Sequence, residues 1–204
     1  RAESVHDMYD AGHSGTSISA CLGYAKARDL KGEDYSCVAV IGDGALTGGV
    51  AWEALSVAGS MQTPLIVVLN DNEMSISKNV GGVSKHLSRL RVRRSYRGAK
   101  KLYLRLVNHI PGGQSIYRFT HKMKEAVKRS LLSNTIFEDM GFTYLGPIDG
   151  HDIRMMERVL REAARMEGPV LVHVLTKKGL GYEPAERHPS RFHGTGAFEV
   201  ETGA

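Results

Sequence analysis

Oxygen-bearing side chains follow two apolar runs of this sequence. Asp43 lies between two glycines after Ser36–Ile41, and Asn70-Asp71-Asn72 follows Leu65–Leu69, with 25 residues between Gly44 and Asn70. Carboxylate, carboxamide and carbonyl oxygens, without an interleaved Cys or His, are ligands that Mg²⁺ prefers alongside water and phosphate oxygens. The spacing therefore predicts a metal-bridged diphosphate site. It leaves the choice among Asn70, Asp71 and Asn72 open.

Two parallel strands are needed to bring these side chains together. Both apolar runs are short and rich in β-branched residues, and the stretch between them carries apolar residues at helical spacing, namely Trp52, Leu55, Ala58 and Gly59. A strand–helix–strand crossover makes the strands parallel, so their carboxyl ends meet at the edge where open α/β sheets bind ligands. Gly44 would let the backbone approach a ligand, and the N–H groups of the following helix would favour an anion.

The rest of the chain adds elements of the same kind. We expect three further helices: one from a cap at Ser14 or Thr16 to about Leu30, a short one over Thr135–Met140 ended by Gly141, and one from its cap Asp152 to Met166. We also expect strands over Phe142–Leu145 and Val170–Leu175, with a loop over Gly146–Gly150 after the first of them. This pattern predicts an α/β fold with three αβα layers and a mostly parallel sheet. Residues 1–204 would form a single diphosphate-binding domain that is incomplete at its N-terminus.

The charge is distributed unevenly along the chain. The net charge is +5, but the segment from Lys78 to Phe137 holds fifteen Lys or Arg and one acidic residue, Glu125, which leaves a net charge of −9 elsewhere. A long, weakly patterned insertion is usually functional or disordered, so we expect a basic, mobile excursion at about residues 80–130. It could gather phosphorylated substrates, form a solvated face or bind nucleic acid. No compact nucleic-acid-binding motif accompanies the charge, which makes the last of these the weakest.

The composition and the cysteines bear on the cellular compartment of the protein. The chain has no apolar run of 18 residues, so we expect no membrane helix. Its first ten residues lack a signal-peptide core and an initiator Met, and they read as the middle of a longer protein. Cys21 and Cys37 form no CxxC motif, and we expect reduced core thiols of a cytoplasmic protein.

Further motifs make the pattern specific. Besides the GDG at 42–44, the chain contains four motifs in order: GHSGTSIS at 12–19, NDNEMSIS at 70–77, GPIDGHD at 146–152 and KKGLGYEPAE at 177–186. With these motifs the chain resembles the 1-deoxy-D-xylulose-5-phosphate synthase family over nearly its whole length. These motifs distinguish that family from its transketolase relatives. The resemblance implies a thiamine diphosphate-binding fold with thiamine diphosphate and Mg²⁺ as cofactors. The implied reaction condenses pyruvate with D-glyceraldehyde 3-phosphate, giving 1-deoxy-D-xylulose 5-phosphate and CO₂ for isoprenoid, thiamine and pyridoxal biosynthesis.

The resemblance also implies roles for individual residues. Asp43, Asn72 and the backbone carbonyl of Met74 would bind Mg²⁺. The implied cofactor contacts are Gly12, His13, Ser14, Gly44, Ala45, Asn72, Ile76 and Tyr182. His193 matches a family histidine that handles substrate or intermediate, although from the sequence alone it is one of nine histidines with no special claim. The acidic residue for ylide formation lies outside this chain, so we expect the chain alone to be inactive.

Two other functions remain open at this point. The chain could be the N-terminal subunit of a split transketolase, or, in a different class, a basic nucleic-acid-binding module. His151 and Asp149 could be catalytic, but a role in a loop and helix cap is at least as plausible. For the intact protein the resemblance implies a homodimer.

Overall fold

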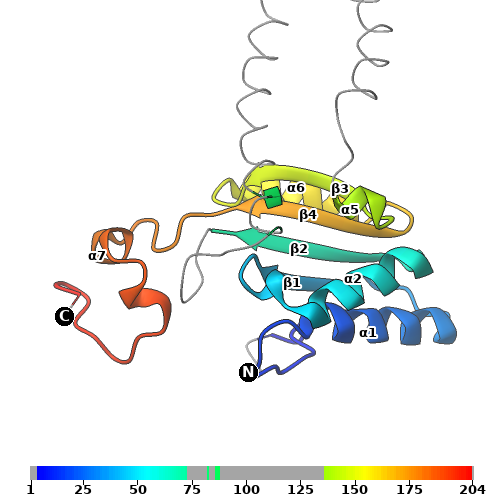
Figure 1. Cartoon of the computed structure of the whole chain (residues 1–204), viewed down its shortest axis with the longest axis horizontal. Coiled ribbons are helices and arrows are strands. Elements are labelled where there is room, and N and C mark those ends of the chain that lie inside the picture. Colours follow the sequence, from blue (N-terminus) through cyan, green and yellow to red (C-terminus); the bar gives the residue numbers. More distant parts are fainter. Residues whose placement is uncertain (1–3, 73–81, 83–85, 88–135, 204) are drawn as a thin grey trace, which may run out of the picture.

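The computed structural model describes residues 4–72, 82, 86–87 and 136–203 (Figure 1). Four strands form one sheet in the order β1-β2-β4-β3, and every pair is parallel. The strands are β1 (Val38–Gly42), β2 (Leu65–Asp71), β3 (Thr143–Asp149) and β4 (Pro169–Leu175). Most of the predicted basic excursion lies outside the described residues.

Helices cover both faces of the sheet. The helices are α1 (Ser17–Lys31), α2 (Gly49–Met61), α5 (Ile136–Asp139), α6 (Ile153–Ala163) and α7 (Glu183–Arg187), with 3-10 turns η1 (Ala45–Thr47) and η2 (Arg191–His193). Helices α1 and α2 run side by side along one side of the sheet (Figure 1), where Leu65, Val67 and Leu69 of β2 join their apolar residues in one core. Ile66 and Val68 point to the other face and pack with α6. The predicted three-layer α/β fold is confirmed.

Several element ends differ from the sequence-based expectation. Strand β3 continues through Gly146–Asp149, which we expected to be a loop, because Ile148 and Asp149 still pair with β4 after a shift of register. The irregularity accommodates Pro147, which has no N–H to donate to the sheet. Helix α6 ends at Ala163 rather than Met166, while its predicted cap is confirmed, since Asp152 accepts a hydrogen bond of 3.0 Å from the Met155 N–H.

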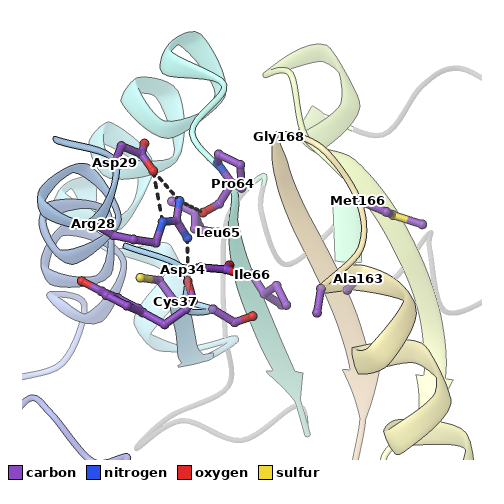
Figure 2. Close-up of a pocket in the computed structure, with 13 residues that line it drawn as sticks. Arg28, Asp29, Asp34, Cys37, Pro64, Leu65, Ile66, Ala163, Met166 and Gly168 are labelled. Atoms are coloured by element: carbon purple, nitrogen blue, oxygen red, sulfur yellow. Dashed lines mark hydrogen bonds and ion pairs between the residues drawn. The ribbon is translucent and has the colours of Figure 1, made fainter. Parts of the chain in front are cut away.

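A buried arginine ties α1 to the amino ends of β1 and β2 (Figure 2). Arg28 is 8% exposed and donates to the carbonyls of Tyr35 (3.0 Å) and Pro64 (2.9 Å) and to the carboxylate of Asp29 (2.8 Å). Burial by itself lowers the pKa of Arg28, but the hydrogen bond and charge of Asp29 outweigh it and the pKa is raised. A cavity of about 290 Å³ lies beside this cluster, over Leu65. It is at the edge opposite the predicted ligand site.

The two cysteines are buried, unpaired thiols of this core. Cys21 on α1 and Cys37 before β1 are each 7% exposed. Burial raises the pKa of Cys21 to about 12, with a smaller contribution from Cys37. In the part of the chain that the structure describes, no helix has the length and apolar character needed to cross a membrane.

Two helical glycines give a matched test of the packing. A Cβ at Gly59 of α2 would lie 1.7 Å from the Met140 carbonyl oxygen, whereas a Cβ at the exposed Gly23 of α1 meets no atom of the described residues within 4 Å. We expect Gly59→Ala to lower the free energy of unfolding by about 1–3 kcal/mol or more, because α2 must move from the turn after α5. Gly23→Ala should raise it by roughly 0.5–1 kcal/mol. Urea unfolding measures both, and equal effects would contradict this packing.

Candidate functional site

The carboxyl ends of β1 and β2 lie side by side, as the crossover predicts. Gly42 pairs with Asn70 in the sheet, and the N–H of Asp43 donates to the carbonyl of Asn70 over 3.1 Å. Asp43 is 3% exposed. This buried carboxylate is therefore fixed beside the last residues of β2.

The structure separates the three candidates at the end of β2. The strand continues through Asn70 and Asp71, two residues beyond the expected end. The Asn70 carboxamide oxygen accepts a 2.6 Å hydrogen bond from the Thr176 hydroxyl, and the Asp71 carboxylate lies 2.9 Å from Nε2 of His173. Both side chains thus contact β4 or the residue after it. Asn72 is the one of the three that lies beyond the strand.

The turn before α1 lies against the turn after Asp43. Gly15 has a φ of +91°, and a Cβ built on it would lie 3.8 Å from the carbonyl oxygen of Ala45. The Thr16 hydroxyl donates to the His13 carbonyl over 3.5 Å, and this side chain makes no capping hydrogen bond to α1. The turns that hold Gly12–Ser14 and Gly44–Ala45 therefore share one edge with the carboxyl ends of the strands (Figure 1).

The helix after Gly44 begins later than expected. The 3-10 turn η1 intervenes, and α2 starts only at Gly49. The backbone N–H groups nearest to Asp43 therefore belong to a tight turn rather than to the first turn of a long helix.

The loop after β4 lies at the same carboxyl edge of the sheet and is hydrogen-bonded to the end of β2. The N–H of Thr176 donates to the Asp71 carbonyl over 3.0 Å, and the N–H of Lys177 donates to Nε2 of His151 over 2.8 Å. The Asp149 carboxylate in turn accepts from the His151 N–H at 3.0 Å. These bonds fit the loop-and-cap reading of His151 and Asp149 rather than a catalytic one.

Tyr182 and His193 lie in a separate cluster. The Tyr182 hydroxyl donates to the carbonyl of Val200 over 2.7 Å, and its ring centroid lies 5.7 Å from Phe192 and 6.0 Å from Phe198. Nδ1 of His193 lies 2.9 Å from Nζ of Lys178. Figure 1 shows α7 and the residues after it standing away from the sheet, beyond its carboxyl edge. The structure thus does not bring this cluster together with Asp43.

The donors at the edge suit a hydrated, phosphate-bound Mg²⁺ better than a zinc ion. Among the described residues, no three His, Cys, Asp or Glu side chains gather as a metal site. Asp43 and Asn72 supply hard oxygens, and Mg²⁺ needs few protein ligands when phosphate and water complete its coordination. Met74 and Ile76 lie outside the described residues, so the structure gives no position for them.

Sequence reasoning missed the polar partners of this edge. His173 is fully buried in β4, and it holds both Asp71 and the hydroxyl of Tyr144. A histidine inside the apolar run VLVHVL was the available signal, because a buried polar side chain needs a hydrogen-bond partner. Neither Thr176 nor Tyr144 carries such a signal.

Comparison with known sequences gives one consistent result. The sequence pattern of a family described as 1-deoxy-D-xylulose-5-phosphate synthase matches residues 1–176. The synthase of that name from Pelotomaculum thermopropionicum is 58% identical over 202 residues, covering 99% of this chain and 32% of that protein. The synthase from Heliobacterium modesticaldum is 54% identical over 204 residues, covering 100% of this chain and 32% of that protein. The chain thus spans about a third of the length of these relatives.

Comparison with solved structures supports the fold. A transketolase from Campylobacter jejuni superimposes with a TM-score of 0.56 and 23% sequence identity, covering 88% of this chain and 23% of that one. At this level of identity the likeness shows a shared fold.

The loop after β4 has a pH-dependent anchor. The pKa of Glu186 lies below its usual value because Lys177, and then the Gly181 N–H at 2.9 Å, hydrogen-bond its carboxylate. A lowered carboxyl pKa stabilises the folded loop above the ordinary value of 4.5, and this contribution is lost as the pH falls through the folded pKa. As the pH falls from 4.5 through the folded pKa of Glu186, we expect the protection of the Gly181 amide from hydrogen exchange, corrected for intrinsic rates, to decrease.

Glu186→Gln should cause the same loss of protection at pH 7. The matched control is Glu183→Gln, which removes an exposed ion pair with Arg187 in the same helix and should leave Gly181 unchanged. Equal protection in wild type and Glu186→Gln would contradict the anchoring role.

Proposed function

The chain belongs to the 1-deoxy-D-xylulose-5-phosphate synthase family, and on that basis we propose that it forms the diphosphate-binding part of a thiamine diphosphate- and Mg²⁺-dependent enzyme. The proposed reaction of the longer protein condenses pyruvate with D-glyceraldehyde 3-phosphate and releases CO₂. The observation that carries the proposal is the arrangement at the carboxyl edge of the sheet. There the Asp43 N–H is hydrogen-bonded to the Asn70 carbonyl, and Asn72 follows directly after β2.

The proposed metal site consists of Asp43, Asn72 and the backbone carbonyl of Met74. One carboxylate and two neutral oxygens would leave positive charge on Mg²⁺ to balance the diphosphate oxygens. The burial of Asp43 supports this role, because a carboxylate attracts a cation more strongly where water screens it less.

The proposed cofactor contacts lie on two turns. Gly12, His13 and Ser14 precede α1, and Gly44 and Ala45 follow β1. The close approach of Gly15 to the Ala45 carbonyl supports a shared role for the two turns. When bound, thiamine diphosphate would supply the carbanion chemistry, and these residues would orient it. Ile76 would pack near its ring.

Tyr182 and His193 would act from the segment after β4. Since α7 and the residues after it stand away from the sheet (Figure 1), a direct contact with the cofactor requires this segment to lie closer to the sheet than it does here. The pair of Lys178 and His193 offers two nitrogen groups to an anionic substrate. The acidic residue that promotes ylide formation would come from outside this chain.

We further propose a homodimer in the cytoplasm. The buried, unpaired Cys21 and Cys37 suit a reducing compartment. A split transketolase subunit is a weaker assignment than part of a synthase, because the identities of 54–58% are to synthases. The likeness to transketolase is one of fold at 23% identity. A nucleic-acid module would depend on the basic segment, most of which lies outside the described residues.

Calorimetric titration of thiamine diphosphate into the full-length protein tests the proposal. With Mg²⁺ present, we expect binding by wild type, and we expect Asp43→Ala and Asn72→Ala each to weaken it by more than the roughly 10–100-fold that loss of an outer-shell partner costs. Without Mg²⁺, wild type and both variants should bind equally weakly. Asp34→Ala, at the opposite edge of the sheet, is the matched control.

Metal-independent binding that Asp43→Ala leaves unchanged would refute the cofactor assignment. Turnover of a sugar-phosphate donor in place of pyruvate would support the transketolase alternative. Binding of nucleic acid that weakens steeply with salt would support the third function.

A further inference from the structure

Three polar side chains on three neighbouring strands meet inside the core, just below the carboxyl edge. His173 of β4 lies between Asp71 of β2 and Tyr144 of β3, with Nε2 2.9 Å from the Asp71 carboxylate and Nδ1 2.7 Å from the Tyr144 hydroxyl. The side chains of Asp71 and His173 are both 0% exposed. In the tautomer that carries its proton on Nε2, the ring donates to the Asp71 carboxylate and its Nδ1 accepts from the Tyr144 hydroxyl.

These groups occupy positions that apolar residues could fill. Leu69 and Leu171, two residues earlier on the same strands, belong to the apolar core on the α1 and α2 side. Replacing a buried ionic or polar pair by packed apolar residues is often neutral or stabilising. A buried network at this place therefore calls for a reason other than stability.

Its location suggests the reason. Asp71 immediately precedes Asn72, and the surrounding bonds hold the backbone on both sides. The Asn70 carbonyl accepts from the Asp43 N–H at 3.1 Å, and the Asp71 carbonyl accepts from the Thr176 N–H at 3.0 Å. The side chain of Asp71 adds an anchor on the core side, one residue before the proposed ligand.

Stacked rings extend the same network to α2, the helix that follows the turn of Asp43. Tyr144 stacks on Phe137 with centroids 6.1 Å apart, and Phe137 stacks on Trp52 of α2, also at 6.1 Å. Helix α2 follows the turn of Asp43 by way of η1. Ring contacts thus run from the network to α2, while the Asp43 N–H bonds to the Asn70 carbonyl directly across the sheet.

We propose that the Asp71–His173–Tyr144 network is a positioning device that fixes Asn72 relative to Asp43 and thereby sets the affinity of this edge for Mg²⁺. The inference rests on the proposed function. Mg²⁺ requires nearly ideal octahedral geometry with short ligand distances, so a small displacement of one ligand weakens binding. The three residues act through Asn72 and are not themselves ligands.

The test measures the Mg²⁺ dissociation constant of the full-length protein by calorimetry with thiamine diphosphate present. We expect Asp71→Asn and Tyr144→Phe each to weaken Mg²⁺ binding by about 10–100-fold, the range typical of outer-shell partners. Tyr144→Phe removes one oxygen and keeps the ring stack, so it should fold. His173→Gln, whose amide can still donate to Asp71, should retain more affinity than His173→Leu.

Two controls separate positioning from general loss of stability. Tyr35→Phe removes a tyrosine hydroxyl at the amino edge, where it donates to the Tyr24 carbonyl over 3.4 Å. Arg28→Met removes the clamp on Pro64 at the opposite end of β2. Urea unfolding without metal should show Arg28→Met to be at least as destabilised as Tyr144→Phe, while both controls retain wild-type Mg²⁺ affinity.

The outcomes are distinct. Wild-type Mg²⁺ affinity in Asp71→Asn and Tyr144→Phe would overturn the positioning role while leaving the proposed function intact. An equal loss of affinity in Arg28→Met would overturn it too, since the effect would then follow stability. If wild type itself shows no Mg²⁺-dependent binding of thiamine diphosphate, the proposed function fails and the inference fails with it.

Discussion

The hydrogen bond from the Asp43 N–H to the Asn70 carbonyl is the contact on which the site depends. It extends the pairing of β1 and β2 by one residue past Gly42. It also fixes the buried Asp43 carboxylate next to the last residues of β2. Parallel pairing makes this possible, because both strands then end at the same edge. The turn before α1 and the loop after β4 approach the same point from either side.

Strand β2 is held at its two ends by different kinds of polar contact. At the amino end, the Arg28 guanidinium bonds to the Pro64 carbonyl and is paired with Asp29. At the carboxyl end, the anchors are the side chains of Asn70 and Asp71. The first cluster joins α1 to the strands and contributes to the fold, whereas the second lies directly beneath the proposed ligands.

The sequence predicts the layers and the central strand–helix–strand because apolar runs and helical spacing report burial directly. It fails where pairing decides the outcome. The continuation of β3 past Gly146 depends on β4, and no local pattern of Gly-Pro-Ile-Asp reveals that partner. The choice among Asn70, Asp71 and Asn72 likewise depends on His173 and Thr176, which are 102 and 106 residues away. Spacing brings the three to the edge, but only tertiary contacts show what the side chains of Asn70 and Asp71 bind.

The energetics of Asp71 and His173 bear on why this chain keeps both. Taking ionisable groups out of water costs several kcal/mol each, and their mutual attraction recovers this only with good hydrogen-bond geometry. A core selected for stability alone would place an apolar residue there, as β2 and β4 do two residues earlier with Leu69 and Leu171. Local violations of core patterning occur where function requires them. Asp71 is such a violation beside the proposed metal site. Arg28 is also a polar residue in the core, at the opposite edge of the sheet. Its guanidinium binds backbone carbonyls that an apolar side chain would leave without a hydrogen bond, so stability alone explains its burial.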